Sequence, residues 1–210
     1  MSAGLKFMLY MKTKLAISKV KDALKSKGYV FFDKGDYNLN IIGVRTSNKI
    51  ANNFDDYIFC IYKVKSIWYF KEWSITTDAG TYWLKNPSVL SGTALLVPNQ
   101  YRGIYKLDKH RGGYTALCQR NGQVDVYRDN DKNVILDYEP DTIESGYFGI
   151  NIHRSNPKKE STKVNKWSAG CQVFQSPLGF DTFIDLCIKS SEIFGNSFTY
   201  TLLTENDFNN

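Results

Sequence analysis

The residues of this chain that could do covalent chemistry lie at the two ends of residues 149–174. An alternating apolar run leads into His153, and the small residues Ser-Ala-Gly precede Cys171. A thiol with an imidazole partner is the nucleophile and base of many thiol enzymes, because the imidazole favours the reactive thiolate. Small residues also permit a tight turn whose N–H groups can face an attacked carbonyl as an oxyanion hole. The alternative is a buried cysteine in a turn with a structural histidine.

Few other residues could bind a metal or support a disulfide framework. The four cysteines are widely spaced without a Cys-x-x-Cys pair, and the only histidines are His110 and His153. This number and spacing are unlike a structural zinc site, and they are too sparse for a disulfide-rich scaffold of 210 residues. We therefore expect no metal and no cofactor. Of the four thiols, we expect three to be buried and one to be functionally important.

The charge of the chain is moderately positive. A net charge of +6 comes from 27 Lys and Arg against 21 Asp and Glu. Such a balance suits an anionic polymer, either nucleic acid or cell wall, and equally an ordinary basic surface. The lysines are scattered and no nucleic-acid-binding motif is present, so we expect no nucleic-acid partner.

The elements expected to position the thiol and the imidazole are mostly strands, because aromatic residues, 15% of the chain, favour strands. An amphipathic helix is expected at residues 13–27, ended by Gly28. A second helix is expected at residues 181–194, with Asp181 as its N-cap and Gly195 as its stop.

Strand patterns recur through the rest of the chain. They fall at residues 29–32, 40–45, 56–64, 66–76, 92–97, 101–107, 115–119, 124–127, 134–138, 147–152 and 197–203. Asn121-Gly122 predicts a two-residue hairpin turn between two of them. The polar turn at residues 76–81 is expected to be either a plain loop or the lining of a cleft.

These patterns predict a mainly β (α+β) fold with one helix near each end. Residues 91–210 are expected to form the catalytic domain. Residues 1–90 would supply a helix and strands packed on it or continuous with it. The apolar run at the start is short and broken by Lys6, and no segment approaches the roughly 20 apolar residues of a membrane span. We therefore expect synthesis in the cytoplasm without a signal peptide and no membrane insertion.

The segment from residue 150 to residue 171 resembles the L,D-transpeptidase (YkuD-like) family. Ile-Asn-Ile before His153 is followed by fourteen residues and then by Ser168, Ala169, Gly170 and Cys171. The family signature is an apolar strand ending in His-Gly, a comparable spacer and Ser/Thr-His-Gly-Cys. Residues 97–101 are loosely similar to the Thr-Pro-x-Gly-x-Phe/Tyr segment of the same family.

The resemblance implies a β-rich sandwich or barrel of L,D-transpeptidase type. It implies Cys171 as the acylating nucleophile and His153 as the base. Ser168 belongs to the same catalytic turn, and the N–H groups of Ala169, Gly170 and Cys171 are implied as oxyanion donors. The implied substrate is the stem peptide of bacterial peptidoglycan, attacked beside a diaminopimelate-type residue where an L centre precedes a D centre.

The chain differs from the family at three positions. Arg154 stands in place of glycine, Ala169 in place of histidine, and Val173 where the family commonly has Arg or Asn. The thiol and the base are retained, while the substrate contacts are altered. Arginine can hold a carboxylate through two parallel hydrogen bonds. The candidates for binding an acidic stem peptide are Arg102, His110, Arg111 and Arg154, with Tyr114 and Trp167 as packing surfaces.

Other thiol enzymes fit the order of residues less well. Papain-like enzymes place the cysteine before the histidine, and sortases need an arginine later in the chain, whereas none follows Arg154. One hypothesis is a peptidoglycan-degrading cysteine peptidase of the phage endolysin type, whose Cys171 acyl-enzyme is resolved by water. A separate holin-like pore would deliver it from the host cytoplasm to the cell envelope. The alternatives are an L,D-transpeptidase, in which an amine resolves the acyl-enzyme, and a non-catalytic wall-binding or virion structural domain.

Overall fold

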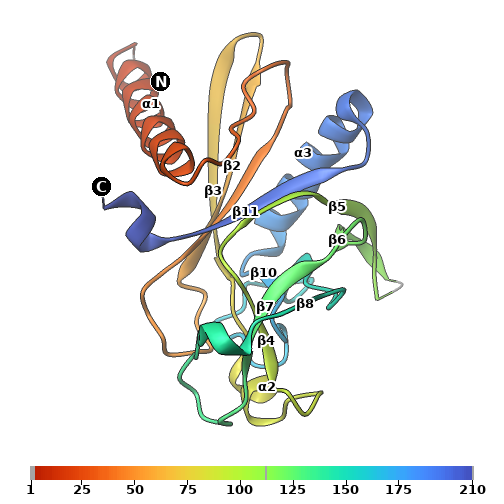
Figure 1. Ribbon diagram of the computed structural model, residues 1–210. Coiled ribbons are helices and arrows are strands. Elements are labelled where there is room, and N and C mark those ends of the chain that lie inside the picture. Colours follow the sequence, from red (N-terminus) through yellow and green to blue (C-terminus); the bar gives the residue numbers. More distant parts are fainter. Residues whose placement is uncertain (1–2, 112, 210) are drawn as a thin grey trace.

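The computed structural model describes residues 3–111 and 113–209 and consists mainly of strands (Figure 1). Eight strands form a closed barrel: β1 (Asn40–Arg45), β2 (Asp56–Val64), β3 (Ile67–Thr76), β5 (Gln100–His110), β6 (Tyr114–Gln119), β9 (Ile152–Arg154), β10 (Gln172–Phe174) and β11 (Phe198–Thr204). Their order around the barrel is β1-β11-β5-β6-β9-β10-β3-β2. The barrel therefore joins strands from both sides of residue 90. The pairs β1–β11 and β9–β10 are parallel, and the other pairs are antiparallel.

A small second sheet and a few helices complete the fold. The sheet has the order β4-β7-β8, made of β4 (Thr93–Leu96), β7 (Val124–Asp129) and β8 (Glu144–Gly146). The α-helices are α1 (Ala3–Ser26), α2 (Thr81–Lys85) and α3 (Pro177–Phe194), and the short 3-10 helices are η1 (Pro140–Thr142) and η2 (Glu205–Phe208). Figure 1 shows α1 and α3 on different sides of one end of the barrel, and α2 with the small sheet at the other end. The predicted mainly β fold with a helix near each end is confirmed. No helix in the described part of the chain is long and apolar enough to cross a membrane.

The interior of the barrel is filled by aromatic and aliphatic side chains. Phe174 from β10 packs against Phe180 and Phe183 from α3, with ring centroids 5.5 and 5.1 Å apart. All three are nearly inaccessible to solvent. Burying a side chain of this size stabilises a fold by roughly 1.5–3 kcal/mol. The helix α3 is thus part of the core that supports β9 and β10.

Both helix ends predicted from glycine are confirmed, whereas both starts differ from the prediction. Gly28 and Gly195 have positive φ angles of 70° and 81° just beyond α1 and α3. The first helix begins at Ala3 rather than at residue 13. The N-cap of α3 is Ser176, not Asp181, because the Ser176 hydroxyl accepts a hydrogen bond from the Gly179 N–H (3.3 Å). Pro177 is the first residue of α3. The N–H of the first helical residue has no partner within the helix, so proline, which lacks this N–H, is well tolerated there. The helix therefore starts earlier than expected.

Two predicted strands, at residues 29–32 and 134–138, are absent from both sheets. Residues 29–32 form no ladder, since side chains satisfy their backbone: Gln100 accepts from the Val30 N–H and Asn40 accepts from the Phe32 N–H. Residues 134–138 make only the isolated bridge between Ile50 and Ile135. Around that bridge the Ala51 N–H donates to the Val134 carbonyl and the Leu136 N–H donates to the Lys49 carbonyl, so the pairing extends over only about one residue on each side.

The predicted hairpin at residues 121–122 is also wrong. These residues join β6 to β7, yet β6 pairs with β5 and β9, whereas β7 pairs with β4 and β8. The turn therefore carries the chain from the barrel to the small sheet. Turn chemistry alone does not decide whether two flanking strands share a sheet.

The turn at residues 76–81 is a buried structural support rather than a cleft lining. Asp78 lies 2.9 Å from the Arg45 guanidinium, and both side chains are almost fully buried. The Thr77 N–H and hydroxyl donate to Asp56 at 2.7 and 2.8 Å. The Gly80 N–H donates to the Ser168 carbonyl (2.9 Å), so this turn holds the segment before Cys171.

Candidate active site

His153 lies in β9, and Cys171 directly precedes the neighbouring parallel strand β10. His153 is the central residue of β9, not the end of a longer strand over residues 147–152 as predicted, because ladder pairing begins only at Ile152. In the register of β9 with β10, His153 pairs with Val173 and Ile152 pairs with Gln172. Ile152 is in the barrel core, so the residues alternating with it face outward. Cys171 lies two residues before Val173 and continues this outward face.

The turn before Cys171 requires glycine at position 170. Gly170 has φ +116°, and a Cβ at this position would lie 2.2 Å from the Ala94 carbonyl oxygen of β4. The Ser168 hydroxyl accepts from the Gly170 N–H (3.1 Å) and donates to the Cys171 carbonyl (2.8 Å). Ser168 therefore closes the turn that presents the thiol.

Two of the three expected oxyanion donors keep a free N–H group. Gly170 already donates to Ser168, whereas the N–H groups of Ala169 and Cys171 donate to no acceptor within residues 3–111 and 113–209. Free N–H groups on a tight turn can stabilise an oxyanion. Ala169 and Cys171 can therefore serve as donors, and Gly170 serves the turn.

The thiol of Cys171 is held by backbone groups and is partly exposed. Its Sγ donates to the Gly149 carbonyl (3.4 Å) and accepts from the Asn151 N–H (3.5 Å). Burial raises the pKa of Cys171 to about 11, although the Asn151 N–H opposes the shift. At neutral pH the thiol therefore keeps its proton.

The imidazole of His153 is buried, and its hydrogen bonds show which of the two ring nitrogens carries the proton. Nδ1 lies 2.8 Å from the Arg154 carbonyl oxygen, which can only accept, so Nδ1 carries the proton. The Tyr114 hydroxyl donates to the same carbonyl (3.3 Å) and lies 3.4 Å from Nδ1. The unprotonated nitrogen is thus Nε2. Burial, followed by the neighbouring His110, lowers the pKa of His153 to about 3.

His110 stacks directly on His153. The ring centroids are 4.2 Å apart and the planes differ by 22°. The Asn151 side-chain oxygen accepts from the Gln119 N–H (2.9 Å), so its amide nitrogen faces His110 Nδ1 (3.2 Å) as a donor. Burial lowers the pKa of His110 to about 4. Asn151 was not predicted as a site residue. Its only sequence signal is a polar side chain in the apolar run, two positions before His153.

Thiol and imidazole lie on one face without a direct hydrogen bond. In the described part of the chain the hydrogen bonds of Cys171 Sγ go to residues 149 and 151, and those of His153 go to Tyr114 and Arg154. Catalytic hydrogen bonds are often long in free enzymes and tighten on the substrate. The arrangement is therefore a neutral thiol near a neutral base, not an ion pair.

A cleft of about 360 Å³ opens beside His153. It is lined by His110, Arg111, Gly113, Tyr114, His153, Arg154, Ser155, Pro157, Lys166 and Trp167. Five of the six predicted substrate-binding residues meet there. The lining holds three cationic side chains and no carboxylate, which suits an anionic ligand. The Arg154 guanidinium lies 4.0 Å from the centre of the Tyr114 ring.

Arg102 is the predicted substrate-binding residue that the structure places elsewhere. It lines a separate hollow with Phe32, Leu39 and Phe194. Lys166, Ser155 and Pro157 were not predicted as cleft residues, since the spacer between His153 and Cys171 looked like a plain polar connection. Only the folded path of that spacer brings them to the cleft.

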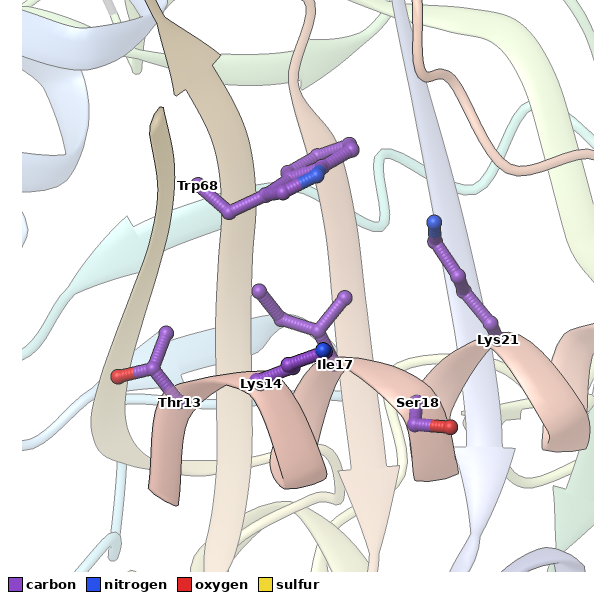
Figure 2. A pocket seen from close by; sticks show the side chains of 6 residues that line it. All are labelled: Thr13, Lys14, Ile17, Ser18, Lys21 and Trp68. Atoms are coloured by element: carbon purple, nitrogen blue, oxygen red, sulfur yellow. The ribbon is translucent and has the colours of Figure 1, made fainter. Parts of the chain in front are cut away.

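A second hollow, of about 270 Å³, lies between α1 and β3. Figure 2 shows Ile17 pointing from α1 toward the Trp68 ring. The Lys21 ammonium lies 4.9 Å from the centre of that ring. No thiol or imidazole lines this hollow, so it offers none of the chemistry of the Cys171 region.

Comparisons with known proteins do not assign the chain to a family. No protein-family model, curated protein or solved structure matches it. Its function is therefore argued from the geometry around Cys171 and His153.

Proposed function

We propose that this protein is a cysteine peptidase with an L,D-transpeptidase-like catalytic domain that cleaves stem peptides of bacterial peptidoglycan. The observation that carries the proposal is the position of His153 in β9 and of Cys171 directly before the parallel neighbour β10, with His153 lining a cationic cleft. The residue pattern around them supports the same assignment. Its place of action would be the peptidoglycan of the cell envelope.

The mechanism begins from neutral groups. As Sγ of Cys171 attacks the scissile carbonyl carbon, Nε2 of His153 accepts the thiol proton. The N–H groups of Ala169 and Cys171 stabilise the oxyanion, an effect typically worth about 10²–10³ in rate for each donor. The imidazolium then gives its proton to the leaving amine, and a thioester to Cys171 remains. Water attacks this thioester with His153 as base, which releases the carboxylic acid and restores the thiol.

The cleft supports an acidic peptide as the substrate. Arg111, Arg154 and Lys166 face it from three different segments of the chain. Arg154 follows the base directly, so a guanidinium stands next to the reacting centre where the resembled family has glycine. Its stacking on Tyr114 limits its freedom and favours two-pronged contact with a carboxylate. Peptidoglycan stem peptides carry such carboxylates.

One observation favours a non-catalytic wall-binding domain as a second candidate. Sγ of Cys171 donates a hydrogen bond to the Gly149 carbonyl. The thiol and the His153 imidazole are both neutral, and no hydrogen bond joins them among the described residues. A protein that only binds the wall needs the cleft and not the thiol. The two candidates therefore differ in whether Cys171 is required for product formation.

Digestion of purified sacculi tests the proposal. We expect wild-type protein to release peptides identifiable by mass spectrometry, and Cys171→Ala to release none. Cys60→Ala is the matched control, because Cys60 is a buried thiol on β2, away from β9 and β10, and its loss should leave the products unchanged. Identical products from wild type and Cys171→Ala, or none from either, would contradict the enzyme assignment. Adding an amino acid as amine acceptor separates hydrolysis from transpeptidation, since only a transpeptidase incorporates it.

A further inference from the structure

Three carboxylates converge where β7 ends, in the region of the small sheet. Asp129 is the last residue of β7, and Asp131 and Asp137 follow on the next loop. One carboxylate oxygen from each lies within 4.8 Å of the others. Calcium binds oxygens at 2.3–2.6 Å, so two ligands on opposite sides of one ion are about 5 Å apart. The three oxygens can therefore share one coordination sphere.

Asp129 has a buried oxygen that lacks a partner. Asp129 is only 1% exposed, and its Oδ1 has no hydrogen-bond partner among the described residues. The other oxygen, Oδ2, accepts from the Asp137 N–H (3.1 Å). Buried carboxylate oxygens without partners are rare and costly. An unpaired buried carboxylate oxygen is a hard donor of the kind that Ca²⁺ binds.

The surroundings of Asp129 are electrostatically suited to a cation. Asp131 and Asp137 each place a carboxylate oxygen within 4.8 Å of one from Asp129, so three acidic groups gather in one small volume. The nearest arginine in the chain, Arg128, is already paired with Glu144 (2.8 Å). Negative charge thus accumulates on this loop, and a divalent ion would neutralise it.

The spacing of the oxygen-bearing residues is that of a calcium-binding loop. Asp129, Asp131 and Asn133 alternate along the chain, as ligands do at the first, third and fifth positions of such loops. The segment is not an EF-hand, because it follows a strand and Val134 stands where an EF-hand has glycine. All donors are hard oxygens, which excludes the softer sites built from Cys and His.

We propose that Asp129, Asp131 and Asp137 form a binding site for one Ca²⁺ ion. The ion binds the carboxylate of Asp129, whose Oδ1 is otherwise unpartnered, and removes the repulsion among the three carboxylates. The ion also stabilises the loop that carries these residues. Two backbone hydrogen bonds already hold this loop against residues 49–51: the Ala51 N–H donates to the Val134 carbonyl (3.0 Å), and the Leu136 N–H donates to the Lys49 carbonyl (2.8 Å). This inference does not depend on the proposed peptidase activity.

Calorimetric titration of Ca²⁺ into the full chain, stripped with a chelator and dialysed, tests the site. We expect one ion per chain with a Kd of about 10⁻⁵–10⁻³ M, between the weakest sensor sites and the extracellular calcium sites. At Ca²⁺ about 100-fold above Kd, the melting temperature should rise by roughly 5–10 °C. Mg²⁺ should bind more weakly, because it demands a stricter octahedral geometry.

Two matched variants make the test specific. Asp131→Asn changes an exposed residue, so it should fold, and it should weaken Ca²⁺ binding at least about 10-fold through the lost charge. Asp141→Asn removes an exposed acid on η1 and should bind like wild type. No saturable binding to wild type, or equal binding by Asp131→Asn, overturns the proposal.

Discussion

Two regions of the molecule bury titratable side chains, around Arg45 and around His153. Arg45 lies 2.9 Å from Asp78, and its guanidinium also donates to the Thr77 hydroxyl (3.0 Å) and to the Leu96 carbonyl (2.9 Å). His153 has no carboxylate partner, and the second imidazole, His110, lies on its face. Burial raises the pKa of Asp78 while Arg45 opposes it, whereas burial and His110 together lower the pKa of His153.

The two regions differ in whether their buried side chains are charged or neutral. A charge in the interior is tolerated only when it is paired and hydrogen-bonded, and the Arg45 region meets that condition. It therefore supports the fold. The His153 region keeps its imidazoles neutral, so Nε2 carries no proton, although a pKa of about 3 makes it a weak base for a thiol with a pKa of about 11. The same burial produces a structural anchor in one place and a candidate base in the other.

Removing the base should have the largest effect on activity. In His153→Gln, peptide release from sacculi should fall by about 10²–10⁴-fold, the usual contribution of general base catalysis. The fold should persist, because the ladder between β9 and β10 uses backbone groups. The initial rate of release and the melting temperature are measured on the same preparations. Unchanged release would show that His153 is structural, like the Arg45 region.

Breaking the buried ion pair should have the largest effect on stability. Asp78→Ala leaves the Arg45 charge uncompensated, and unfolding in urea should show a loss of about 3–5 kcal/mol. The matched control is Asp108→Ala, which breaks the exposed pair of Asp108 with Arg120 (2.8 Å). Its unfolding curve should nearly coincide with that of wild type. Equal destabilisation by both variants would contradict the distinction between the buried and exposed pairs.

The reactivity of the Cys171 thiol should report its neutral state. With a pKa of about 11, its thiolate fraction at pH 8.5 is roughly 100-fold below that of an ordinary cysteine with a pKa near 8.5. Alkylation by iodoacetamide, followed by peptide mass spectrometry, should therefore accelerate up to about pH 11. Levelling near pH 8.5 would mean that Cys171 is not shielded in the way that the structure indicates.

The smallest expected effect concerns acid stability. The pKa of His110 is about 4 when folded and near 6.5 when unfolded, so the unfolded chain binds the extra proton between these values. His110 therefore costs stability as pH falls from about 6.5 to 4. Compared with His110→Phe, which keeps a stacked ring, wild type should lose roughly 1–3 kcal/mol more over this window. Parallel stability curves for the two proteins would refute the neutral stacked pair.

Local patterns predicted much of the secondary structure. The strand at residues 40–45 matches β1, and the hairpin predicted at residues 56–76 matches β2 and β3, because alternation and a polar turn are local signals. Glycine marked both helix ends, since positive φ is a property of one residue. The strand at residues 134–138 failed because a strand needs a partner, and its pattern does not reveal whether one is available.

The candidate site divides in the same way. The residue types and the spacing of His153 and Cys171 were visible in the sequence, as was the requirement for small residues before the thiol. Asn151 could not be recognised, because its role depends on His110, which β5 brings from far along the chain. Arg102 was wrongly predicted to bind the substrate, because it follows the segment at residues 97–101 that resembles the family. In the structure its side chain lines a different hollow.

The sequence by itself determined which side chains can act as nucleophile and base, and the tight turn that presents the thiol. Only the tertiary structure decided that Cys171 and His153 share one face, because strand register is set by pairing across the barrel. It also decided their protonation. A pKa depends on burial and on neighbours such as His110, and these are assembled only when distant strands pack together.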